Sequence, residues 1–340
     1  MKSSKRILTF LILTCLLTFT LIIYKLPFYI YKPGGVDPLE EVVQVDDGFV
    51  SEGAMHLVTV SGGQATVMDY LFASLQSFNE IVPLEKVRPK GMTQEEYIQY
   101  QLKLMENSQH ASVVVAYEAA NKEVTFEDNG IFVIGVVEGM PAAESVHVGD
   151  RFTKVDGRQI QNSADLISYV EQKKAGEYIE VQIVRDDELI TKELEVATFP
   201  DDENKVGIGI QLVNDTEVSV NPEVMFDSGN IGGPSAGLMF SLEMYDQLTE
   251  EDITKGYKIA GTGEIDYEGN VHRIGGIDKK VVAADKAGIE IFFAPYENGS
   301  KESNYEIALQ TATQINSKME IVPVDTFTDA LNYLQDLEHK

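Results

Sequence analysis

The segment from Phe226 to Gly237 reads FDSGNIGGPSAG and decides how the chain is interpreted. An apolar run with helical spacing follows at 238–248, so Ser235 lies where a glycine-rich turn enters a helix. Glycines let a substrate backbone approach closely, and the free N–H groups at a helix start can hold a developing oxyanion. The pattern makes Ser235 a candidate nucleophile. A Gly-Pro-Ser helix N-cap without chemistry is the alternative from this segment alone.

A serine nucleophile needs a base that takes its proton. The five histidines form no HExxH pair and no triad-like spacing, and His272 lies in a turn-like stretch typical of a surface residue. The other candidate is a lysine that burial keeps neutral. A predicted helix over 275–288, ended by Gly288, places Lys280 on its apolar face and Lys279 on the face towards water. A Lys280 with a buried stem and a solvated ammonium is the alternative.

The composition limits the class of protein. The 340 residues are 44% hydrophobic, which is enough for a sizeable core and suggests two or three domains. The 55 acidic and 27 basic side chains give a net charge of −28, which disfavours nucleic-acid partners because phosphate backbones are also negative. The single cysteine, Cys15, excludes an intramolecular disulfide and a thiolate metal cluster. We therefore expect no metal site, no cofactor and no nucleic acid.

The first 35 residues carry five basic residues and no acid. The eighteen residues from Ile7 to Tyr24 are uncharged, and at about 1.5 Å per residue they just cross a hydrocarbon core of about 30 Å. A cleaved signal peptide is the alternative, but an A-x-A-like site is missing, and Leu26 to Tyr31 form an aromatic cluster suited to a membrane interface. We predict a retained signal-anchor with a cytoplasmic N-terminus, a linker from Lys32 to Pro38, and residues 36–340 outside.

Two strands and two helices are expected between this linker and residue 120. The strands are predicted at 42–45 and 55–60. Thr93 and Glu96 form a capping-box pattern that predicts a helix continuing to residue 105. A second helix, over 109–120, is rich in Ala and Val and is expected to be buried.

The stretch from 121 to 198 changes to short strand-like runs separated by glycines. A buried strand is expected at 130–137, a helix at 163–173 and two further strands over 178–196. With the GxPA, VGD and VDG elements between them, this order resembles a PDZ domain of bacterial exported proteases. The resemblance implies a groove beside the helix that accepts an extended peptide, although we find no glycine-rich carboxylate-binding loop before Gly130. A role as a spacer or lid is the alternative.

Three motifs occur in order around and after the candidate serine. They are GPSAG at 233–237, GTGEI at 261–265, and IGG at 274–276, which precedes Lys280. Together they resemble the proteolytic domain of the Lon family over residues 200–340.

The resemblance assigns roles to individual residues. In that family the serine of PSAG is the nucleophile and a lysine after the IGG turn is its partner. The match implies that Ser235 is the nucleophile, Lys280 the general base and Thr262 a supporting hydroxyl. It also implies an oxyanion and substrate-binding turn at Gly232 and Gly233. The chain departs from full-length Lon proteins at Gly232, where an acidic residue is common.

The expected fold class is α+β. We predict a Lon-type α/β proteolytic domain with an inserted PDZ-like β-rich domain and one N-terminal transmembrane helix. The boundaries are 1–35 for the cytoplasmic tip, anchor and linker, 36–120 for the N-terminal part of the protease domain, 121–198 for the PDZ-like domain, and 199–340 for the proteolytic domain with its Ser-Lys dyad. The whole chain is similar to the membrane-anchored Lon-PDZ proteases, a family that includes pheromone-processing members.

These features predict a single-pass membrane serine endopeptidase that works on the extracytoplasmic side. The P-loop motif GxxxxGK(S/T) is missing from the sequence, so cleavage is expected to be independent of ATP. Exported or membrane-tethered peptides and proteins are the expected substrates, and homo-oligomerisation is left open. The alternative is a catalytically inactive, membrane-bound PDZ adaptor, against which the joint presence of Ser235, Thr262 and Lys280 argues.

Overall fold

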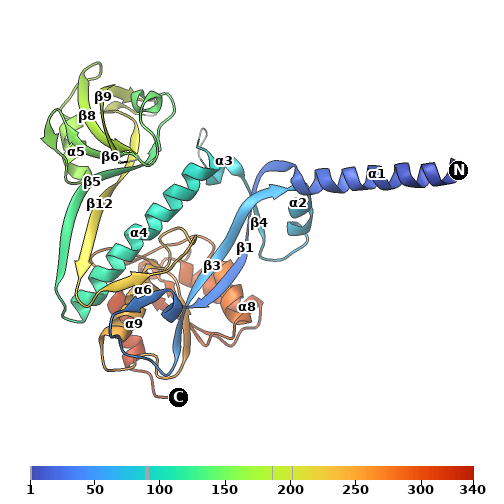
Figure 1. Ribbon diagram of the computed structural model, residues 1–340. Helices are drawn as coiled ribbons and strands as arrows, with labels where there is room; N and C mark the ends of the chain where they lie inside the picture. Colours follow the sequence, from blue (N-terminus) through green and yellow to red (C-terminus); the bar gives the residue numbers. More distant parts are fainter. Residues whose placement is uncertain (1, 89–91, 186, 201) are drawn as a thin grey trace.

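The computed structural model describes residues 2–88, 92–185, 187–200 and 202–340. Figure 1 shows three parts: a long N-terminal helix that projects away from the rest, a central body of helices and strands, and a smaller β-rich lobe. The lobe is joined to the body by a ribbon of two strands, one entering it and one returning.

The body is built on a six-stranded mixed sheet in the order β18-β17-β14-β3-β1-β4. Strands β18, β17, β14 and β3 run parallel, whereas β1 runs antiparallel between β3 and β4. Strand β17 is buried at every residue, as a parallel strand covered on both faces requires. The strands are β1 (Lys25–Pro38), β3 (Ala54–Thr66), β4 (Glu80–Pro83), β14 (Lys258–Gly261), β17 (Ile291–Pro295) and β18 (Glu320–Val324).

Helices cover both faces of this sheet, and successive strand residues contribute to opposite cores. Phe293 packs with α4, α6 and α9 on one face, whereas Phe292 packs with α7 and α8 on the other. Two short strand pairs, β2 with β13 and β15 with β16, complete the body. These elements are α2 (Val67–Ala73), α3 (Leu84–Val87), α4 (Gln94–Ala119), α6 (Gly237–Leu248), α7 (Ile277–Lys286), α8 (Asn304–Gln314), α9 (Phe327–Gln335), β2 (Val43–Val45), β13 (Val224–Phe226), β15 (Glu264–Ile265) and β16 (Val271–His272).

Helix α4 replaces the two helices predicted before residue 120. Its capping box is confirmed: the Thr93 side chain accepts from the Glu96 N–H, and the Glu96 carboxylate accepts from the Thr93 N–H. The helix continues through the polar residues 106–109, because α4 packs along α6 and that tertiary contact outweighs the weaker helix propensity of Asn107 and Ser108. Its second half is buried, as predicted.

The predicted linker from Lys32 to Pro38 is wrong, because these residues form the second half of β1. The aromatic cluster assigned to a membrane interface forms its first half. Tyr29 and Ile30 are buried there, between β3 and β4. Gly34 allows β1 to lie this close to β3, since a Cβ at that position would lie 2.5 Å from the Thr59 carbonyl oxygen.

A chain truncated at its N-terminus is expected to show that β1 belongs to the body. A chain that begins at Lys25 should fold, whereas one that begins at Val36 loses the segment of β1 that pairs with β4 and two buried side chains. We expect the shorter chain to lose at least about 3 kcal/mol of unfolding free energy. Thermal melts followed by circular dichroism measure this difference. Equal melting temperatures for the two chains would contradict the assignment of β1 to the sheet.

The smaller lobe contains a five-strand path in the order β12-β5-β6-β8-β9, one helix and a hydrophobic core of its own. The predicted strands and the order of elements are confirmed, but the helix ends at Val170 and not at 173. The elements are β5 (Val124–Val136), β6 (Arg151–Val155), β7 (Arg158–Gln159), α5 (Ser163–Val170), β8 (Tyr178–Arg185), β9 (Glu188–Glu195), β10 (Ala197–Phe199), β11 (Asp202–Gly207) and β12 (Ile210–Val220).

A buried ion pair holds α4 against the ribbon that carries the lobe. Lys103 Nζ lies 2.6 Å from the carboxylate of Asp215 on β12, and both side chains are more than nine-tenths buried. Arg151 on β6 contacts the second oxygen of the same carboxylate. Removing one partner from such a pair leaves an uncompensated buried charge, so this contact constrains how β12 lies on α4.

The N-terminal helix α1 (Lys2–Ile23) covers nearly all of the apolar run predicted to cross a membrane. Among the residues whose side chains are described, no helix meets the length and hydropathy expected of a membrane span. The side chains of Lys2, Lys5 and Arg6, which the predicted orientation uses, lie outside the described residues.

Candidate active site

Ser235, Thr262 and Lys280 come from three separate segments and meet at one point. Ser235 lies in the turn before α6, Thr262 follows β14, and Lys280 lies in the second turn of α7. Lys280 Nζ is 2.9 Å from Ser235 Oγ and 2.9 Å from Thr262 Oγ1. The Lys280 amine is therefore within hydrogen-bonding distance of both the predicted nucleophile and the predicted supporting hydroxyl.

Lys280 is buried, as the helical projection predicts, with 3% of its surface exposed. Burial penalises the charged form and lowers the pKa of Lys280 from its ordinary value of 10.5 to about 7. A lysine with that pKa is neutral in a large fraction of molecules at physiological pH. Its amine can therefore accept a proton, which a solvated lysine does rarely.

Thr262 orients both partners of this pair. Its hydroxyl donates to the Ser235 carbonyl at 2.8 Å, and the Gly263 N–H donates to the same oxygen at 3.0 Å. Because the Thr262 proton is committed to that carbonyl, its oxygen accepts an N–H from Lys280. A neutral amine that donates to Thr262 can direct its lone pair at the Ser235 hydroxyl.

The glycine-rich turn before Ser235 is held against α4. Gly233 has a φ of +89°, which favours glycine, and its N–H donates to the Gln101 carbonyl at 2.8 Å. Gly232 approaches α4 so closely that a Cβ would lie 2.7 Å from the Cβ of Gln101. Ser108 on α4 donates its hydroxyl to the Pro234 carbonyl at 2.8 Å. Sequence reasoning missed Gln101 and Ser108, because no local pattern relates α4 to this turn.

The Gly233 N–H is therefore already bonded and does not serve the oxyanion in this arrangement, contrary to its predicted role. Among the described residues, the N–H groups of Gly232, Ser235 and Ala236 have no protein acceptor. Those of Ser235 and Ala236 precede α6, where the helix dipole also favours negative charge. They are the available donors for a tetrahedral oxyanion.

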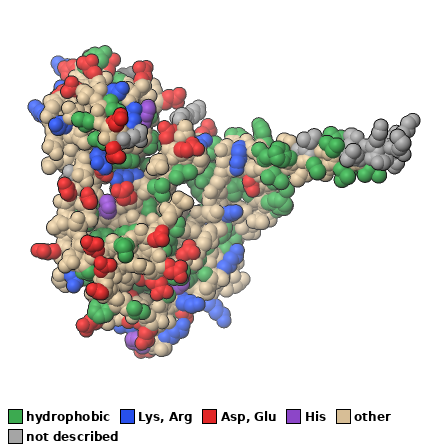
Figure 2. Space-filling view, viewed as in Figure 1, with side chains coloured by type: hydrophobic (Ala, Val, Ile, Leu, Met, Phe, Trp, Pro, Cys, Tyr) green, Lys and Arg blue, Asp and Glu red, His purple; other side chains and the backbone are tan. Residues whose placement is uncertain are grey.

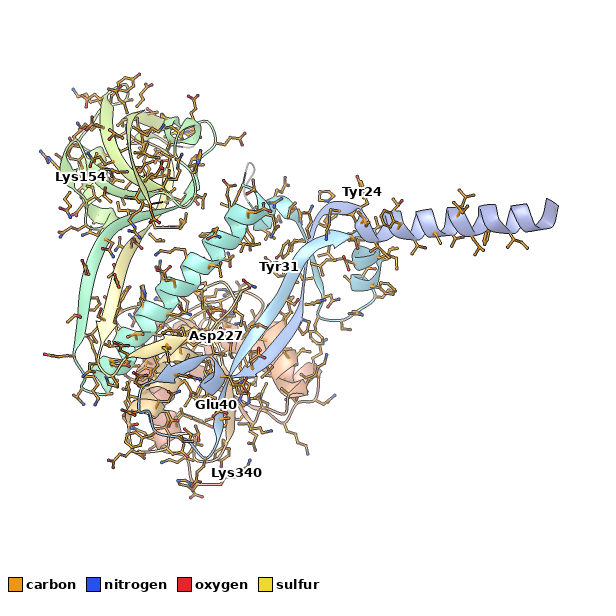
Figure 3. The ribbon with its side chains drawn as sticks, viewed as in Figure 1. Tyr24, Tyr31, Glu40, Lys154, Asp227 and Lys340 are labelled. Carbon is orange, nitrogen blue, oxygen red and sulfur yellow. The ribbon has the colours of Figure 1, made fainter. Side chains whose placement is uncertain are left out.

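A cleft of about 620 Å³ opens onto Ser235 and Lys280. One wall is strand β3 from Leu57 to Ser61, of which Val58 to Ser61 lie beyond the residues that pair with β14. The opposite wall includes Tyr97 and Met105 of α4. Tyr31, labelled on β1 in Figure 3, also lines the cleft. The cleft thus combines aromatic walls with an unpaired strand edge.

Two families match this chain. The PDZ domain family matches residues 109–196, and the Lon protease C-terminal proteolytic domain matches residues 205–336. The chain is 34% identical to the Lon protease of Campylobacter jejuni over 144 residues, which are 39% of this chain and 17% of that protein. It is 36% identical to the Lon protease of Methanosarcina barkeri over 108 residues, 31% of this chain and 12% of that protein.

The chain contains a PDZ domain and a Lon-type proteolytic domain. It spans less than a fifth of the length of these Lon proteases. Among solved structures, the PDZ domain of an SdrC-like protein from Listeria monocytogenes is similar, at 29% identity, with 25% of this chain and 88% of that chain covered and a TM-score of 0.24. The Lon matches support a serine endopeptidase.

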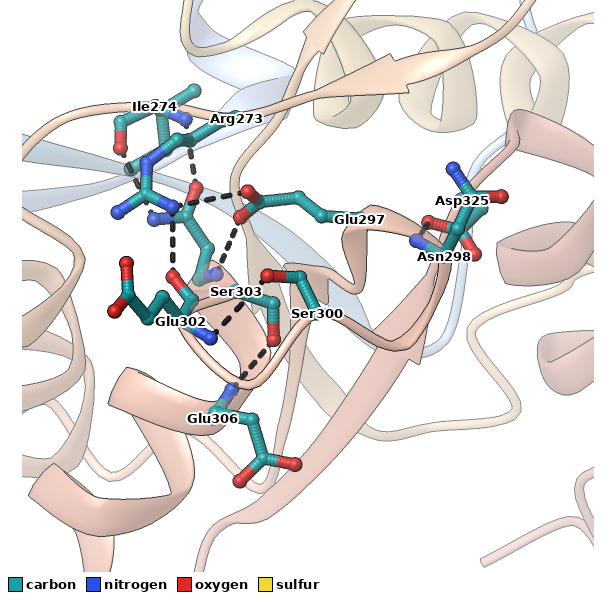
Figure 4. Close-up of polar contacts among 10 residues, drawn as sticks. Arg273, Ile274, Glu297, Asn298, Ser300, Glu302, Ser303, Glu306 and Asp325 are labelled. Carbon is teal, nitrogen blue, oxygen red and sulfur yellow. Dashed lines mark hydrogen bonds and ion pairs between the residues drawn. The ribbon is translucent and has the colours of Figure 1, made fainter.

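In the Lon-type domain, a polar network positions the turn that enters α7. Figure 4 shows Arg273 bonded to the carboxylate of Glu297 and to the Glu302 carbonyl. The buried Asn304 side chain accepts from the Ile274 N–H at 2.7 Å and donates to the Ile274 carbonyl. These bonds hold the two residues just before Gly275 and Gly276, and thereby fix where the Lys280 helix begins.

Lys279 is not solvated, contrary to the helical projection. Its side chain is 3% exposed, and its ammonium pairs with Glu80 of β4 at 2.8 Å and with Asp278. The projection could not anticipate this, since α7 packs against β1 and β3, and Glu80 at the start of β4 pairs with the ammonium, all from a distant part of the sequence. His272 is exposed and pairs with Asp266, which confirms its prediction as a surface residue.

The PDZ domain has an apolar groove between α5 and the start of β12. Its volume is about 200 Å³, and it is lined by Leu166 and Val170 on one side and by Ile208 and Ile210 on the other. A glycine-containing turn at 207–209 also lines this groove. Strand β12 follows this turn and pairs with β5, which lies at the other end of the inserted segment.

Proposed function

We propose that this chain is a membrane-anchored serine endopeptidase that uses a Ser235–Lys280 dyad and requires no ATP. The observation that carries the proposal is the contact between the buried Lys280 amine and the Ser235 hydroxyl inside the open cleft. The missing P-loop motif supports nucleotide independence.

The first half of the reaction acylates the serine. Neutral Lys280 accepts the Ser235 proton while Oγ attacks the carbonyl carbon of the scissile peptide. The N–H groups of Ser235 and Ala236 stabilise the oxyanion of the tetrahedral intermediate. The Lys280 ammonium then donates its proton to the leaving amine, the C–N bond breaks, and an acyl ester remains on Ser235. Water attacks that ester with Lys280 again as the base, which restores the free hydroxyl.

The substrate is an extended segment of an exported or membrane-tethered protein. The unpaired edge of β3 beside Ser235 suits a peptide that adds as a strand. The PDZ groove suits a second apolar segment of the same substrate and increases its local concentration. The uncharged run in α1 and the basic residues around it support an anchor that leaves the catalytic part on the extracytoplasmic side.

The direct test uses the full-length chain in lipid nanodiscs with a dye-labelled unstructured protein. We expect cleavage without nucleotide, no change on adding ATP, and labelling by a fluorophosphonate probe. The Ser235→Ala variant should lose both cleavage and labelling, whereas Ser228→Ala, in the same loop, should keep both. A chain that binds peptides but shows neither activity would instead be an inactive PDZ adaptor, and strict dependence on ATP would contradict the nucleotide independence.

The PDZ domain is expected to affect substrate capture and not bond cleavage. Because Val136 pairs with Ile210, residues 137–209 can be replaced by an Asn-Gly turn that keeps β5 and β12 as a hairpin. This variant should cleave a short fluorogenic peptide at a rate within about twofold of the full chain. Its kcat/KM for a long substrate should fall at least about tenfold, because the second binding site is lost.

The variant also retains Lys103 and Asp215, so the contact between α4 and the ribbon is preserved. A melting curve equal to that of the full chain excludes a folding defect. An equal loss of activity on both substrates would show that the PDZ domain is needed for the chemistry itself.

A further inference from the structure

The segment from Val67 to Asn79, which connects β3 to β4, is nearly free of charge. Its thirteen residues include one ionisable acid or base, Asp69, in a chain of which 24% is charged. That carboxylate is occupied by the residue just before the segment: it accepts from the Thr66 N–H at 2.9 Å and from the Thr66 hydroxyl at 2.7 Å. These bonds lower the pKa of Asp69 and fix its charge at the start of α2.

Three large apolar side chains of this segment face outwards. Leu71 is 53% exposed, Phe72 is 57% exposed and Leu75 is 82% exposed. Single exposed apolar residues are normal, but three in the end of one short helix and the turn after it form a patch that water solvates poorly. We call these three residues the apolar tip.

The apolar tip lies where α1 leaves the body. Helix α1 contacts both α2 and the end of β3. The last residues of α1, Ile22 and Ile23, are themselves exposed. Figure 1 shows α2 beside the C-terminal end of α1, and Figure 2 shows hydrophobic surface gathered at the base of the projecting helix. The two apolar surfaces therefore meet at one end of the molecule.

We propose that the apolar tip inserts into the interfacial layer of the bilayer that α1 spans. The inference rests on the proposed membrane anchor. Lipid is the partner that covers the apolar tip, because the tip is continuous with the exposed apolar surface of α1. The segment around the tip also has no charge free for pairing with another protein. Lys25, the first residue of β1, is exposed and suits the lipid headgroups at the same level.

Two attachments orient the active site relative to the membrane, whereas a single helix leaves the body free to tilt. The strand pair of β1 and β3 runs from the apolar tip to the cleft. From Thr66 to Val58 it covers about 26 Å, at about 3.3 Å per residue. The two attachments then hold the cleft at about this distance from the apolar tip. At that distance it can reach the extended segment that follows a substrate's own membrane anchor.

The absence of tryptophan from the sequence gives a test without background fluorescence. Single tryptophans are introduced as Leu75→Trp in the apolar tip, Phe19→Trp in α1, and Leu189→Trp on an exposed strand of the PDZ domain. Each full-length variant is placed in nanodiscs that hold one copy, with lipids brominated on their acyl chains. The inference predicts quenched, blue-shifted emission for Leu75→Trp and Phe19→Trp, and unquenched emission for Leu189→Trp.

The outcomes separate this inference from the proposed anchor. Quenching of Phe19→Trp without quenching of Leu75→Trp overturns the inference and leaves the anchor standing. Quenching of neither overturns the anchor, and the inference with it. If the emission of Leu75→Trp shifts only as the protein concentration rises in detergent, the apolar tip contacts a second copy of the chain. That result also overturns the inference. Unchanged peptide turnover by all three variants verifies that they fold.

Discussion

Lys280→Ala is expected to lower kcat/KM for peptide cleavage by about 10²–10⁴-fold, the usual contribution of a positioned general base. Lys280→Arg should lose as much, because a guanidinium stays protonated and cannot accept the Ser235 proton. Initial rates on a fluorogenic peptide at pH 8 measure both effects. Binding of the peptide should persist in both variants, since neither change blocks the cleft.

Lys279→Ala is the matched control, one residue away on the same helix. Lys279 is buried, but its ammonium pairs with Glu80 and Asp278 and not with Ser235. Because Glu80 is half exposed, losing this pair should cost about 1 kcal/mol of unfolding free energy or less, with most of the activity kept. An inactive Lys279→Ala beside an active Lys280→Ala would reject the proposed base.

Lys280→Met is expected to make the protein more stable while removing its activity. The folded chain lowers the pKa of Lys280 to about 7, so between that pH and 10.5 the unfolded chain binds more protons than the folded one. The free energy of unfolding therefore rises with pH across this window, and the full penalty of burying the charge applies below pH 7. At about 1.4 kcal/mol per pKa unit, less the lost hydrogen bonds, methionine should add about 2–4 kcal/mol near pH 7.

Urea denaturation at several pH values measures this gain. The difference between Lys280→Met and the unmodified chain should be largest below pH 7 and should vanish near pH 10.5. The same titration should appear in catalysis, where kcat/KM of the unmodified enzyme rises with pH through about 7 as the amine becomes neutral. A stability difference that does not depend on pH would mean that Lys280 is charged in the folded chain.

Local patterns in the sequence identified the parts of the site that neighbouring residues encode. The turn containing Ser235, the capping box of Thr93 and Glu96, and the apolar face of Lys280 depend on spacing within one segment, and the structure contains each of them. The order of strands in the PDZ domain could be predicted for the same reason. Period-two and period-3.6 patterns are properties of adjacent residues and need no knowledge of the fold.

Tertiary structure alone decided the features that depend on distant segments. Lys279 is buried because α7 packs against β1 and β3, with Glu80 of β4 beside its ammonium, and the Gly233 N–H is occupied because α4 brings the Gln101 carbonyl to it. The stretch from Lys32 to Pro38 became a strand because β3 offers it partners, although its prolines and glycines are typical of a linker. Burial and hydrogen-bond partners are set by whatever packs against a residue, and no pattern within a single segment specifies that neighbour.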